Sequence, residues 1–381
     1  MGSRILVLSA MLAAAAIVVG CGSAGGSDED DGGEYKLGAI LSLSGAAADL
    51  GQHERDAIEL AIDQINAAGG VDGREITVEL VDDGTEPDRT VAAFNDLVRD
   101  DSVLAIFGGT LGTTTLAMSP LSAKQGVPLL SPNTTYDITR QGNDYLFRVA
   151  PPADAEIEAT AELAREQGWE RLALLHSTDA YASQAAGLFA ESDLDLVGSE
   201  SFDPEDTDMT AQLTKLNRAN PDALLVWDLS PATGIAIRNA GQLGMTDIPI
   251  LSGQGSNNPG NIDAAGNSPA LDNWIVQGVV DEHDPLDRQT DGIELLEPGL
   301  DYSVDTFASL GYDGVRLFAA ALEEAGDDPS RDSVRDALEQ VSYDGLGGEY
   351  RYSPDDHDGV GPESIVWLEV RDGGLATAQL D

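Results

Sequence analysis

The stretch FGGTLGTTT, residues 107–115, brings glycines and hydroxyl residues together where a strand is expected to give way to a helix. An apolar run at residues 103–107 ends in two glycines, and threonines follow before a helix-like segment. Backbone N–H groups at a helix start favour a bound anion, and nearby hydroxyls add neutral hydrogen-bond donors. The stretch therefore indicates an anion-binding loop, with plain helix capping by threonine as the alternative.

Two other loops have a similar composition. The sequence SLSG at residues 42–45 and the sequence SPNTT at residues 131–135 also follow apolar, strand-like runs. In open α/β sheets, ligands bind at the carboxyl ends of the strands. Capping alone would explain any one of these loops, whereas three of them at one edge of a sheet favour a binding site.

Motifs for catalysis, metal binding and cofactor binding are missing from the sequence. The four histidines, His53, His176, His283 and His357, show no metal-ligand spacing and no HExxH motif. No GxSxG motif occurs, no GxGxxG motif follows the first strand, and no GKS or GKT sequence follows Gly108 and Gly109. Pairs such as Asp82 and Asp83 are expected by chance among 68 acidic residues. The sequence predicts a protein without enzymatic activity, catalytic residues, metal or cofactor.

Strand-like and helix-like segments alternate along the chain. In the first part, strands are expected at 36–41, 76–81, 103–107 and 127–130, and helices at 51–68, 88–99 and 113–125. After two prolines at 151–152, helices are expected at 153–167, 180–190, 208–219 and 232–243, with strands at 172–176, 195–199, 223–227 and 248–251. A loop beyond residue 281 precedes helices at 303–325 and 331–340, and late strands are expected at 348–352 and 365–370.

This alternation predicts an α/β fold with two Rossmann-like lobes, each built around a parallel central sheet. Lobe one is expected to comprise residues 35–150 and about 281–347, and lobe two residues 151–280 and about 348–381. The chain would then pass between the lobes three times, and these passages would form a three-strand hinge.

The charge of the chain limits its partners. The formal net charge is -48, from 68 acidic and 20 basic residues. Such a chain repels nucleic acid and anionic membrane surfaces, so nucleic acid is not an expected partner. The charge suits a protein that stays hydrated at high salt and favours a halophilic source. An acidic extracellular protein in ordinary salt is the alternative.

The N-terminus has the pattern of a lipoprotein export signal. Residues 1–20 hold one arginine and a short apolar run, and Cys21 is the only cysteine. The sequence VVGC at residues 18–21 resembles a bacterial lipobox, which implies lipid attachment to Cys21 and cleavage before it. Residues 22–34, rich in Gly, Ser, Asp and Glu, would be a flexible tether. We expect a protein anchored outside the cytoplasm, with an ordinary signal peptide as the alternative.

Several segments of the folded part resemble type I periplasmic binding proteins of the leucine/isoleucine/valine and amide family. They are the sequence from KLGAILSLSG to ITVELVDD at 36–83, GGTLGTTTLAMSPLSAKQGVPLLSPNTT at 108–135, FRVAPP at 147–152, LGYDGVRLFAAALEEAG at 310–326 and YDGLGGEYRYSPD at 343–355. The resemblance covers about residues 35–375. It implies a monomeric extracytoplasmic receptor that delivers a small molecule to the permease of an ABC importer.

The resemblance also implies binding residues in lobe one. The family's carboxylate-binding serine, four residues after Gly108, is replaced by Gly112, so that backbone N–H groups or Thr113 would serve instead. The family's backbone clamp and threonine after Ser-Pro correspond to Asn133 and Thr135.

In lobe two, the family's tyrosine that packs on the ligand corresponds to Tyr181, and the acid that neutralises a ligand ammonium corresponds to Gln254. Gln254 brings no charge, so Asp228 or Asp179 would have to take over. The binding residues expected from the resemblance are Gly112, Thr113, Asn133, Thr134, Thr135, Tyr181, Asp228 and Gln254.

The ligand depends on these acids, because a buried ammonium without an acidic partner costs several kcal/mol. If Asp228 or Asp179 reaches the cleft, a branched-chain or other neutral amino acid is expected. If neither does, an amide, a urea-like compound or a simple carboxylate fits better. A ligand sensor that signals to a membrane partner is the alternative to a transport receptor.

Overall fold

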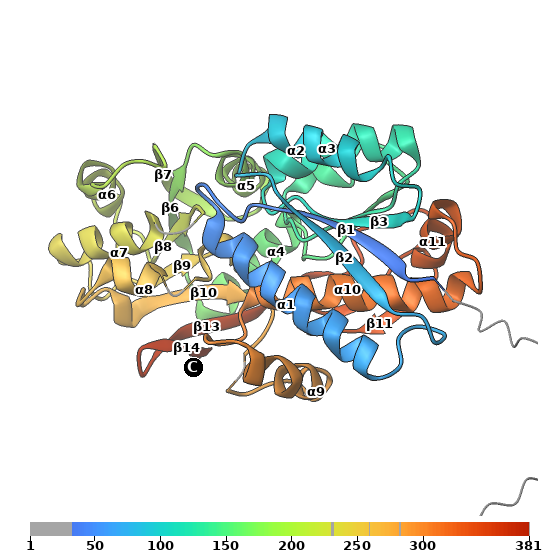
Figure 1. Ribbon diagram of the computed structural model, residues 1–381. Coiled ribbons are helices and arrows are strands. Elements are labelled where there is room, and N and C mark those ends of the chain that lie inside the picture. The colour runs from blue at the N-terminus through green and yellow to red at the C-terminus, as the bar shows by residue number, and fades with distance from the viewer. Residues whose placement is uncertain (1–32, 230–231, 259, 282, 381) are drawn as a thin grey trace, which may run out of the picture. The chain divides into compact units, whose positions relative to one another are not determined.

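The computed structural model describes residues 33–380 except 230–231, 259 and 282, and the proposed lipid site at Cys21 lies outside the described residues. Two sheets organise this part of the chain (Figure 1). Among the described residues, no helix is long and apolar enough to cross a membrane, and no cluster of His, Cys, Asp and Glu suits a metal ion.

The first sheet has five strands in the order β2-β1-β3-β4-β5, and every pair is parallel. Its strands are β1 (Tyr35–Leu41), β2 (Ile76–Asp82), β3 (Val103–Gly108), β4 (Leu129–Ser131) and β5 (Leu146–Arg148). The segments between them include α1 (Ala48–Ala67), α2 (Pro87–Leu97), α3 (Gly112–Gln125) and the short 3-10 helix η1 (Tyr136–Ile138).

The second sheet has seven strands in the order β14-β13-β10-β9-β8-β6-β7. The strands β6 (Arg171–Ser177), β7 (Asp195–Phe202), β8 (Ala223–Trp227), β9 (Ile250–Ser252) and β10 (Trp274–Gly278) are parallel, and β13 (Val366–Arg371) and β14 (Gly374–Thr377) join antiparallel. Its helical segments are α4 (Ala153–Gln167), α5 (Ala180–Glu191), α6 (Thr210–Asn217), α7 (Ala232–Gln242), η2 (Gln254–Ser256), α8 (Gly260–Ala265) and η3 (Leu271–Asn273).

Both sheets are covered on both faces, as the alternation of strands and helices predicts. Leu37, Ala39 and Leu41 of β1 face the core under α1 and α10 (Thr306–Ala325), whereas Ile40 faces α2 and α3. In β8, Leu224 and Val226 face α6 and α7, and the intervening residues face α4 and α5. The structure confirms the predicted α/β class with two lobes around parallel sheets.

The chain passes between the sheets three times, after β5, after β10 and before β13. The first and third passages are joined directly. The Arg148 N–H donates to the His357 carbonyl (2.8 Å), and the hydroxyl of Tyr352 donates to the Arg148 carbonyl (2.7 Å). Tyr350 and Tyr352, expected from the sequence in lobe two, lie in the core beside the first sheet.

The remaining elements show where the sequence prediction differs from the structure. They are α9 (Asp287–Leu296), η4 (Glu297–Gly299), α11 (Arg331–Leu338), the hairpin of β11 (Ser342–Asp344) and β12 (Glu349–Arg351), and η5 (Pro362–Ser364). The helix α9 replaces the loop expected beyond residue 281; its buried residues Gln289, Gly292, Ile293 and Leu296 have helical spacing, but only two of them are apolar. The expected start of the next helix at 303 was wrong, since Asp305 caps α10 and accepts a hydrogen bond from the Ala308 N–H (2.9 Å).

Candidate functional site

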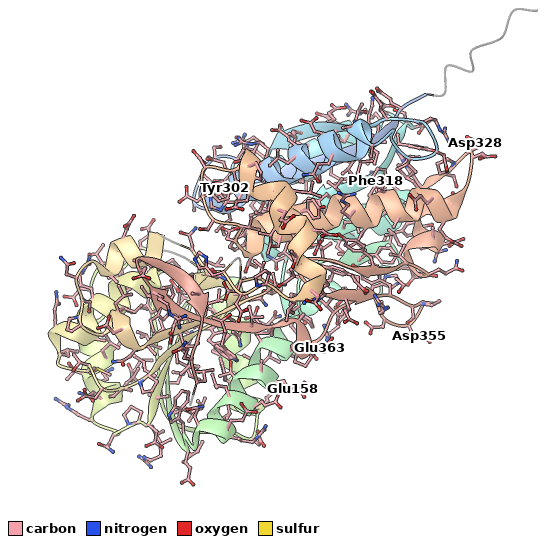
Figure 2. All side chains as sticks on the ribbon, turned by 90° about the horizontal axis from the view of Figure 1, so that it is seen from below. Glu158, Tyr302, Phe318, Asp328, Asp355 and Glu363 are labelled. Atoms are coloured by element: carbon pink, nitrogen blue, oxygen red, sulfur yellow. The ribbon has the colours of Figure 1, made fainter. Side chains whose placement is uncertain are left out.

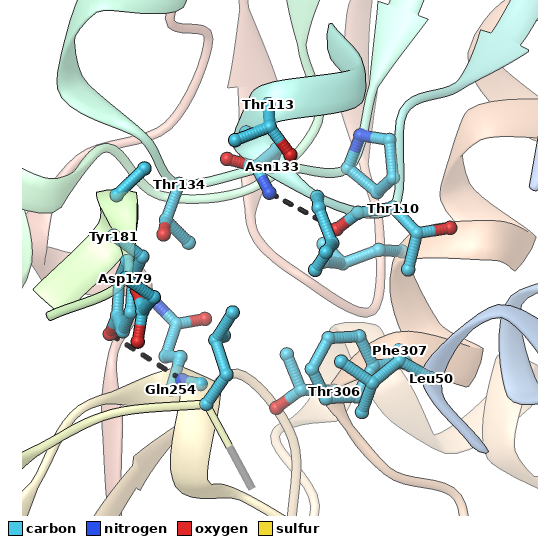
Figure 3. Close-up of a pocket in the computed structure, with 17 residues that line it drawn as sticks. Leu50, Thr110, Thr113, Asn133, Thr134, Asp179, Tyr181, Gln254, Thr306 and Phe307 are labelled. Carbon is cyan, nitrogen blue, oxygen red and sulfur yellow. Dashed lines mark hydrogen bonds between the residues drawn. The ribbon is translucent and has the colours of Figure 1, made fainter. Parts of the chain in front are cut away.

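A cavity of about 80 Å³ lies between the loops after β3 and β4 on one side and segments of the second sheet on the other (Figure 3). Its apolar part consists of Leu50, Leu111, Leu229, Phe307 and Leu310. Its polar side chains are Thr110, Thr113, Asn133, Thr134, Asp179, Tyr181, Gln254 and Thr306. Because pockets for drug-sized ligands measure roughly 300–1,000 Å³, this volume suits a ligand of few heavy atoms.

The glycines of the FGGTLGTTT stretch are required by its tight backbone. Gly108 and Gly109 have φ of 145° and 81°, which residues with a side chain rarely adopt. A Cβ on Gly108 would lie 2.1 Å from the Ile40 carbonyl oxygen, and one on Gly109 would lie 2.2 Å from the Thr115 Oγ1. The turn therefore brings the start of α3 close to the sheet edge.

The start of α3 presents free backbone donors to the cavity. The N–H groups of Thr114 and Thr115 donate to the Leu111 carbonyl, as in an ordinary first turn. Those of Gly112 and Thr113 have no partner among the described residues, and both residues line the cavity. No Lys, Arg or His is among the described lining residues, so an anion here would be held by neutral donors.

Gly112 lacks a side chain because Thr135 occupies the space. A Cβ on Gly112 would lie 2.1 Å from the Thr135 Oγ1 and 2.9 Å from its Cβ. The Thr135 hydroxyl is buried, does not line the cavity and has no hydrogen-bond partner among the described residues. Thr135 therefore lies behind the first turn of α3, whereas the resemblance implied a position among the ligand-binding residues.

The side chain of Arg148 supports the loop at residues 131–136. This residue was not among those predicted from the sequence. Its fully buried guanidinium donates to the carbonyls of Asn133 (2.7 Å) and Thr135 (2.9 Å) and pairs with Asp358 (2.8 Å). Asn133 also braces the loop, because its Nδ2 donates to the Thr110 carbonyl (3.1 Å). Burial lowers the pKa of Arg148, and Asp358 acts in the opposite direction.

Tyr181 and Gln254 line the opposite side of the cavity and share a buried acid. The hydroxyl of Tyr181 donates to Glu156 Oε2 (2.6 Å), and the Nε2 of Gln254 donates to Glu156 Oε1 (3.3 Å). Glu156 is fully buried, and burial raises its pKa to about 8. No local sequence signal indicates its role, since Glu156 lies among other acids in the helix α4.

The two acids considered for a ligand ammonium lie in different places. Asp228 is fully buried and does not line the cavity; its Oδ1 accepts hydrogen bonds from the hydroxyls of Thr233 and Ser256, and burial raises its pKa to about 7. Asp179 lines the cavity and caps α5, accepting a hydrogen bond from the Ala182 N–H (2.9 Å). It is the only carboxylate among the described lining residues.

The residues named from the sequence therefore divide into two groups. The structure brings Gly112, Thr113, Asn133, Thr134, Tyr181 and Gln254 to the cavity, and it places Thr135 and Asp228 behind its wall. The sequence analysis missed the apolar lining residues and Thr306, which begins α10. The cap at Asp305 was the one available signal for this helix start.

Hydrogen bonds close the cavity between the two sheets. The side chain of Gln184 on α5 accepts from the Tyr136 N–H (2.5 Å) and donates to Asp137 (2.8 Å). The Nδ2 of Asn257, just after η2, donates to the Thr306 hydroxyl (3.0 Å). These contacts join segments of the two sheets on different sides of the lining residues.

Comparison with known proteins identifies the family. The model of the family described as periplasmic binding protein matches residues 34–374. The chain belongs to the periplasmic binding protein family. This membership confirms the resemblance seen in the sequence and the expectation that the chain is a binding protein rather than an enzyme. It also implies a small-molecule ligand, an ABC transporter context and a location outside the cytoplasm.

The relatives include well-matched binding proteins. Leu/Ile/Val-binding protein homolog 3 of Brucella melitensis is 25% identical over 311 residues, which are 80% of this chain and 83% of the relative. A leucine-, isoleucine-, valine-, threonine- and alanine-binding protein of Pseudomonas aeruginosa is 25% identical over 316 residues, covering 81% and 83%.

Among solved structures, the substrate-binding protein LivJ of a branched-chain amino acid transporter from Streptococcus pneumoniae, in complex with isoleucine, has a TM-score of 0.81 and 26% identity. The match covers 91% of this chain and 99% of that one. The leucine-binding protein LivK from Thermotoga maritima shares the fold, with a TM-score of 0.80 at 23% identity and coverage of 90% and 97%.

The substitution Gly112→Ser tests the packing against Thr135. We expect it to lower the free energy of unfolding by about 1–3 kcal/mol, because the new Cβ would overlap the threonine side chain. Adding Thr135→Ala should recover part of this loss, because it removes the Oγ1 but keeps the Cβ 2.9 Å away, and urea unfolding of both variants would measure the difference. Gly187→Ser is the matched control, since nothing lies within 4 Å of a Cβ there. An equal loss of unfolding free energy in Gly112→Ser and in Gly187→Ser would contradict a clash with Thr135.

The substitution Arg148→Lys tests the support of the 131–136 loop. A lysine cannot reproduce the planar fork that reaches three carbonyls and Asp358, and each buried carbonyl left unpaired costs about 1–3 kcal/mol. Urea unfolding should show this loss. Arg140→Lys should change the stability far less, because Arg140 is partly exposed although it also pairs with Asp358 (3.2 Å). Equal stability of both variants would show that the buried fork is dispensable.

Proposed function

We propose that this protein is the lipid-anchored receptor of an ABC importer and that it binds a small neutral amino acid, of the branched-chain type, between its two lobes. The observation that carries the proposal is the position of Asp179, a carboxylate at a cavity that otherwise offers neutral donors and apolar surface. The Leu/Ile/Val-binding relatives and the isoleucine complex of LivJ support the same ligand class.

Each part of such a ligand has a matching part of the cavity. The carboxylate would bind the free N–H groups of Gly112 and Thr113, where the start of α3 favours negative charge. The ammonium would lie toward Asp179, and the aliphatic side chain would pack against Leu50 and Phe307. This arrangement gives each charge of the zwitterion a partner: neutral N–H donors for the carboxylate and the Asp179 carboxylate for the ammonium.

The alternative ligands fit less well. An amide, a urea-like compound or a simple carboxylate has no cationic group to pair with Asp179. A simple carboxylate would also bring a second negative charge close to that side chain, which is unfavourable. Asp179, the one acid among the described lining residues, therefore favours a zwitterion, although Asp228 does not reach the cavity.

Closure about the three passages between the sheets is the proposed mechanism. One lobe, expected at residues 35–150 and about 281–347, would capture the ligand first, and the other would then close over it. The bonds from Gln184 to Tyr136 and Asp137, and from Asn257 to Thr306, would hold the closed form that the permease recognises.

Binding of L-leucine to the mature chain tests the ligand class. We expect L-leucine, L-isoleucine and L-valine to raise the melting temperature, and calorimetry should show weaker binding of 4-methyl-2-oxopentanoate, acetamide and urea. Asp179→Asn should lower the affinity for L-leucine roughly 10- to 100-fold, corresponding to the about 1.5–3 kcal/mol that a hydrogen bond to a charged group contributes. Asp195→Asn, at an exposed position on β7, is the control and should bind as the unmodified chain does.

Two outcomes would contradict this proposal. No stabilisation by any of the amino acids would exclude the ligand class. Equal affinity of the Asp179→Asn variant for L-leucine would exclude the ammonium site while leaving the class open.

The lipid anchor is a separate part of the proposal, supported by the VVGC sequence and by the position of the only cysteine. In a bacterial host, the chain should incorporate labelled palmitate and fractionate with membranes, because two or three acyl chains give lasting attachment. Cys21→Ser should abolish the label and release the protein from membranes. Palmitate labelling that persists in this variant would refute the site.

A further inference from the structure

Glu156 lies behind the cavity wall at a point where two lining side chains meet. Tyr181, from α5, and Gln254, from η2, donate hydrogen bonds to its two carboxyl oxygens, at 2.6 and 3.3 Å. Thr134, from the loop after β4, accepts a hydrogen bond on its carbonyl from the Ala153 N–H at the start of α4 (2.8 Å). The helix that carries Glu156 is thereby attached to the loop after β4, and the carboxyl of Glu156 binds the lining residues of α5 and η2.

The surroundings of Glu156 contain little to neutralise a negative charge. The nearby cation is Arg148, whose hydrogen bonds go to Asp358 and to backbone carbonyls. The other titratable groups that face this cluster are Tyr181 and, on the far side of Tyr181, Asp179. Burial outweighs Arg148 and raises the pKa of Glu156 to about 8, so the carboxyl is mostly protonated at neutral pH in the unliganded chain.

The state of Glu156 decides which atoms of its partners face a ligand. An ionised carboxylate only accepts hydrogen bonds, so it engages the Gln254 amide nitrogen and the Tyr181 hydroxyl hydrogen. The Oε1 of Gln254 then remains as a free hydrogen-bond acceptor, because it is buried and has no partner among the described residues. The Tyr181 oxygen accepts a hydrogen bond from the Gly255 N–H (3.5 Å) and keeps one further lone pair for a ligand, so an ionised Glu156 gives this wall two acceptors.

We propose that Glu156 is the positioning residue for the ligand's ammonium group: it turns the oxygens of Gln254 and Tyr181 toward the cavity, and its proton leaves to solvent when the ligand binds. The proposal rests on the proposed amino-acid ligand and deepens it. A cationic group in the cavity favours the ionised carboxyl, and that form in turn presents the acceptors that the ammonium needs.

Proton release gives the affinity a defined pH dependence. When the complex holds fewer protons than the free chain, affinity rises with pH. The rise should continue up to the pKa of the free chain near 8 and then level off. Glu54, Asp228 and His53 also have raised pKa values, but they are unchanged in a Glu156 variant, so the difference between the two proteins isolates Glu156.

The test is calorimetry of L-leucine binding to the mature chain and to Glu156→Gln between about pH 6 and about pH 8, in two buffers that differ in ionisation enthalpy. The unmodified chain should release up to about one proton per ligand near neutral pH. The variant, an uncharged mimic of the protonated acid, should bind at least about tenfold more weakly at about pH 8, since one pKa unit corresponds to tenfold. It should also release fewer protons per bound ligand, and its affinity should depend less on pH.

Glu158→Gln is the matched control, because Glu158 lies two residues along the same helix and is exposed (Figure 2). It should behave as the unmodified chain does. If Glu156→Gln does not fold, Tyr181→Phe replaces it; removing the hydroxyl that bonds Glu156 should lower affinity and flatten the pH profile.

The outcomes separate this inference from the proposed function. A chain that binds no amino acid refutes the proposed function. A chain that binds L-leucine with the same affinity, proton release and pH profile in the Glu156 or Tyr181 variant overturns the role of Glu156 and leaves the function intact.

Discussion

The buried guanidinium of Arg148 is the interaction on which the cavity most depends. It leaves the first sheet at the end of β5 and binds three carbonyls of the 131–136 loop, those of Asn133, Thr135 and Tyr136, as well as Asp358 of the third passage between the sheets. A buried ion pair is costly unless further hydrogen bonds satisfy it, and here those hydrogen bonds are supplied by the loop that lines the cavity. The loop's conformation and the connection of two passages are therefore held by one side chain, close to the expected hinge.

The two sides of the cavity also share a pattern of buried acids behind hydroxyls. Thr110 donates to Glu54 Oε2 (2.7 Å) on one side, as Tyr181 donates to Glu156 on the other. Burial raises the pKa of each acid to about 8, because no basic side chain hydrogen-bonds to either among the described residues. Each hydroxyl is therefore oriented by an acid that a ligand does not touch. The net charge of -48 acts in the same direction as burial, because surrounding negative charge disfavours ionisation of a carboxyl.

The sequence predicts the sheets well and the cavity only in part. The strand β8 is a continuous apolar run and β1 is mostly apolar, so the positions of such strands along the chain and the α/β class follow from the pattern. Residues identified by resemblance, such as Tyr181, reach the cavity because their place at the start of a helix is fixed by the fold. Glu156 and Arg148 were not identified, because their roles arise from partners far along the chain, such as Gln254 and Asp358. Periodicity and local motifs do not carry that information.

The position of Gly112 shows how the cavity differs in construction from the serine-based pattern that the resemblance implied. The space of a side chain is filled by Thr135 from the neighbouring loop, and the N–H groups of Gly112 and Thr113 remain free. Backbone donors at a helix start attract a carboxylate without a counter-charge, while Asp179 and the acceptors near Glu156 lie on the opposite side. A zwitterion therefore has one favourable orientation, and reversing it would place its carboxylate against Asp179. Under the proposed function, this opposition of neutral donors and acidic acceptors, rather than a single charged residue, would select and orient an amino acid.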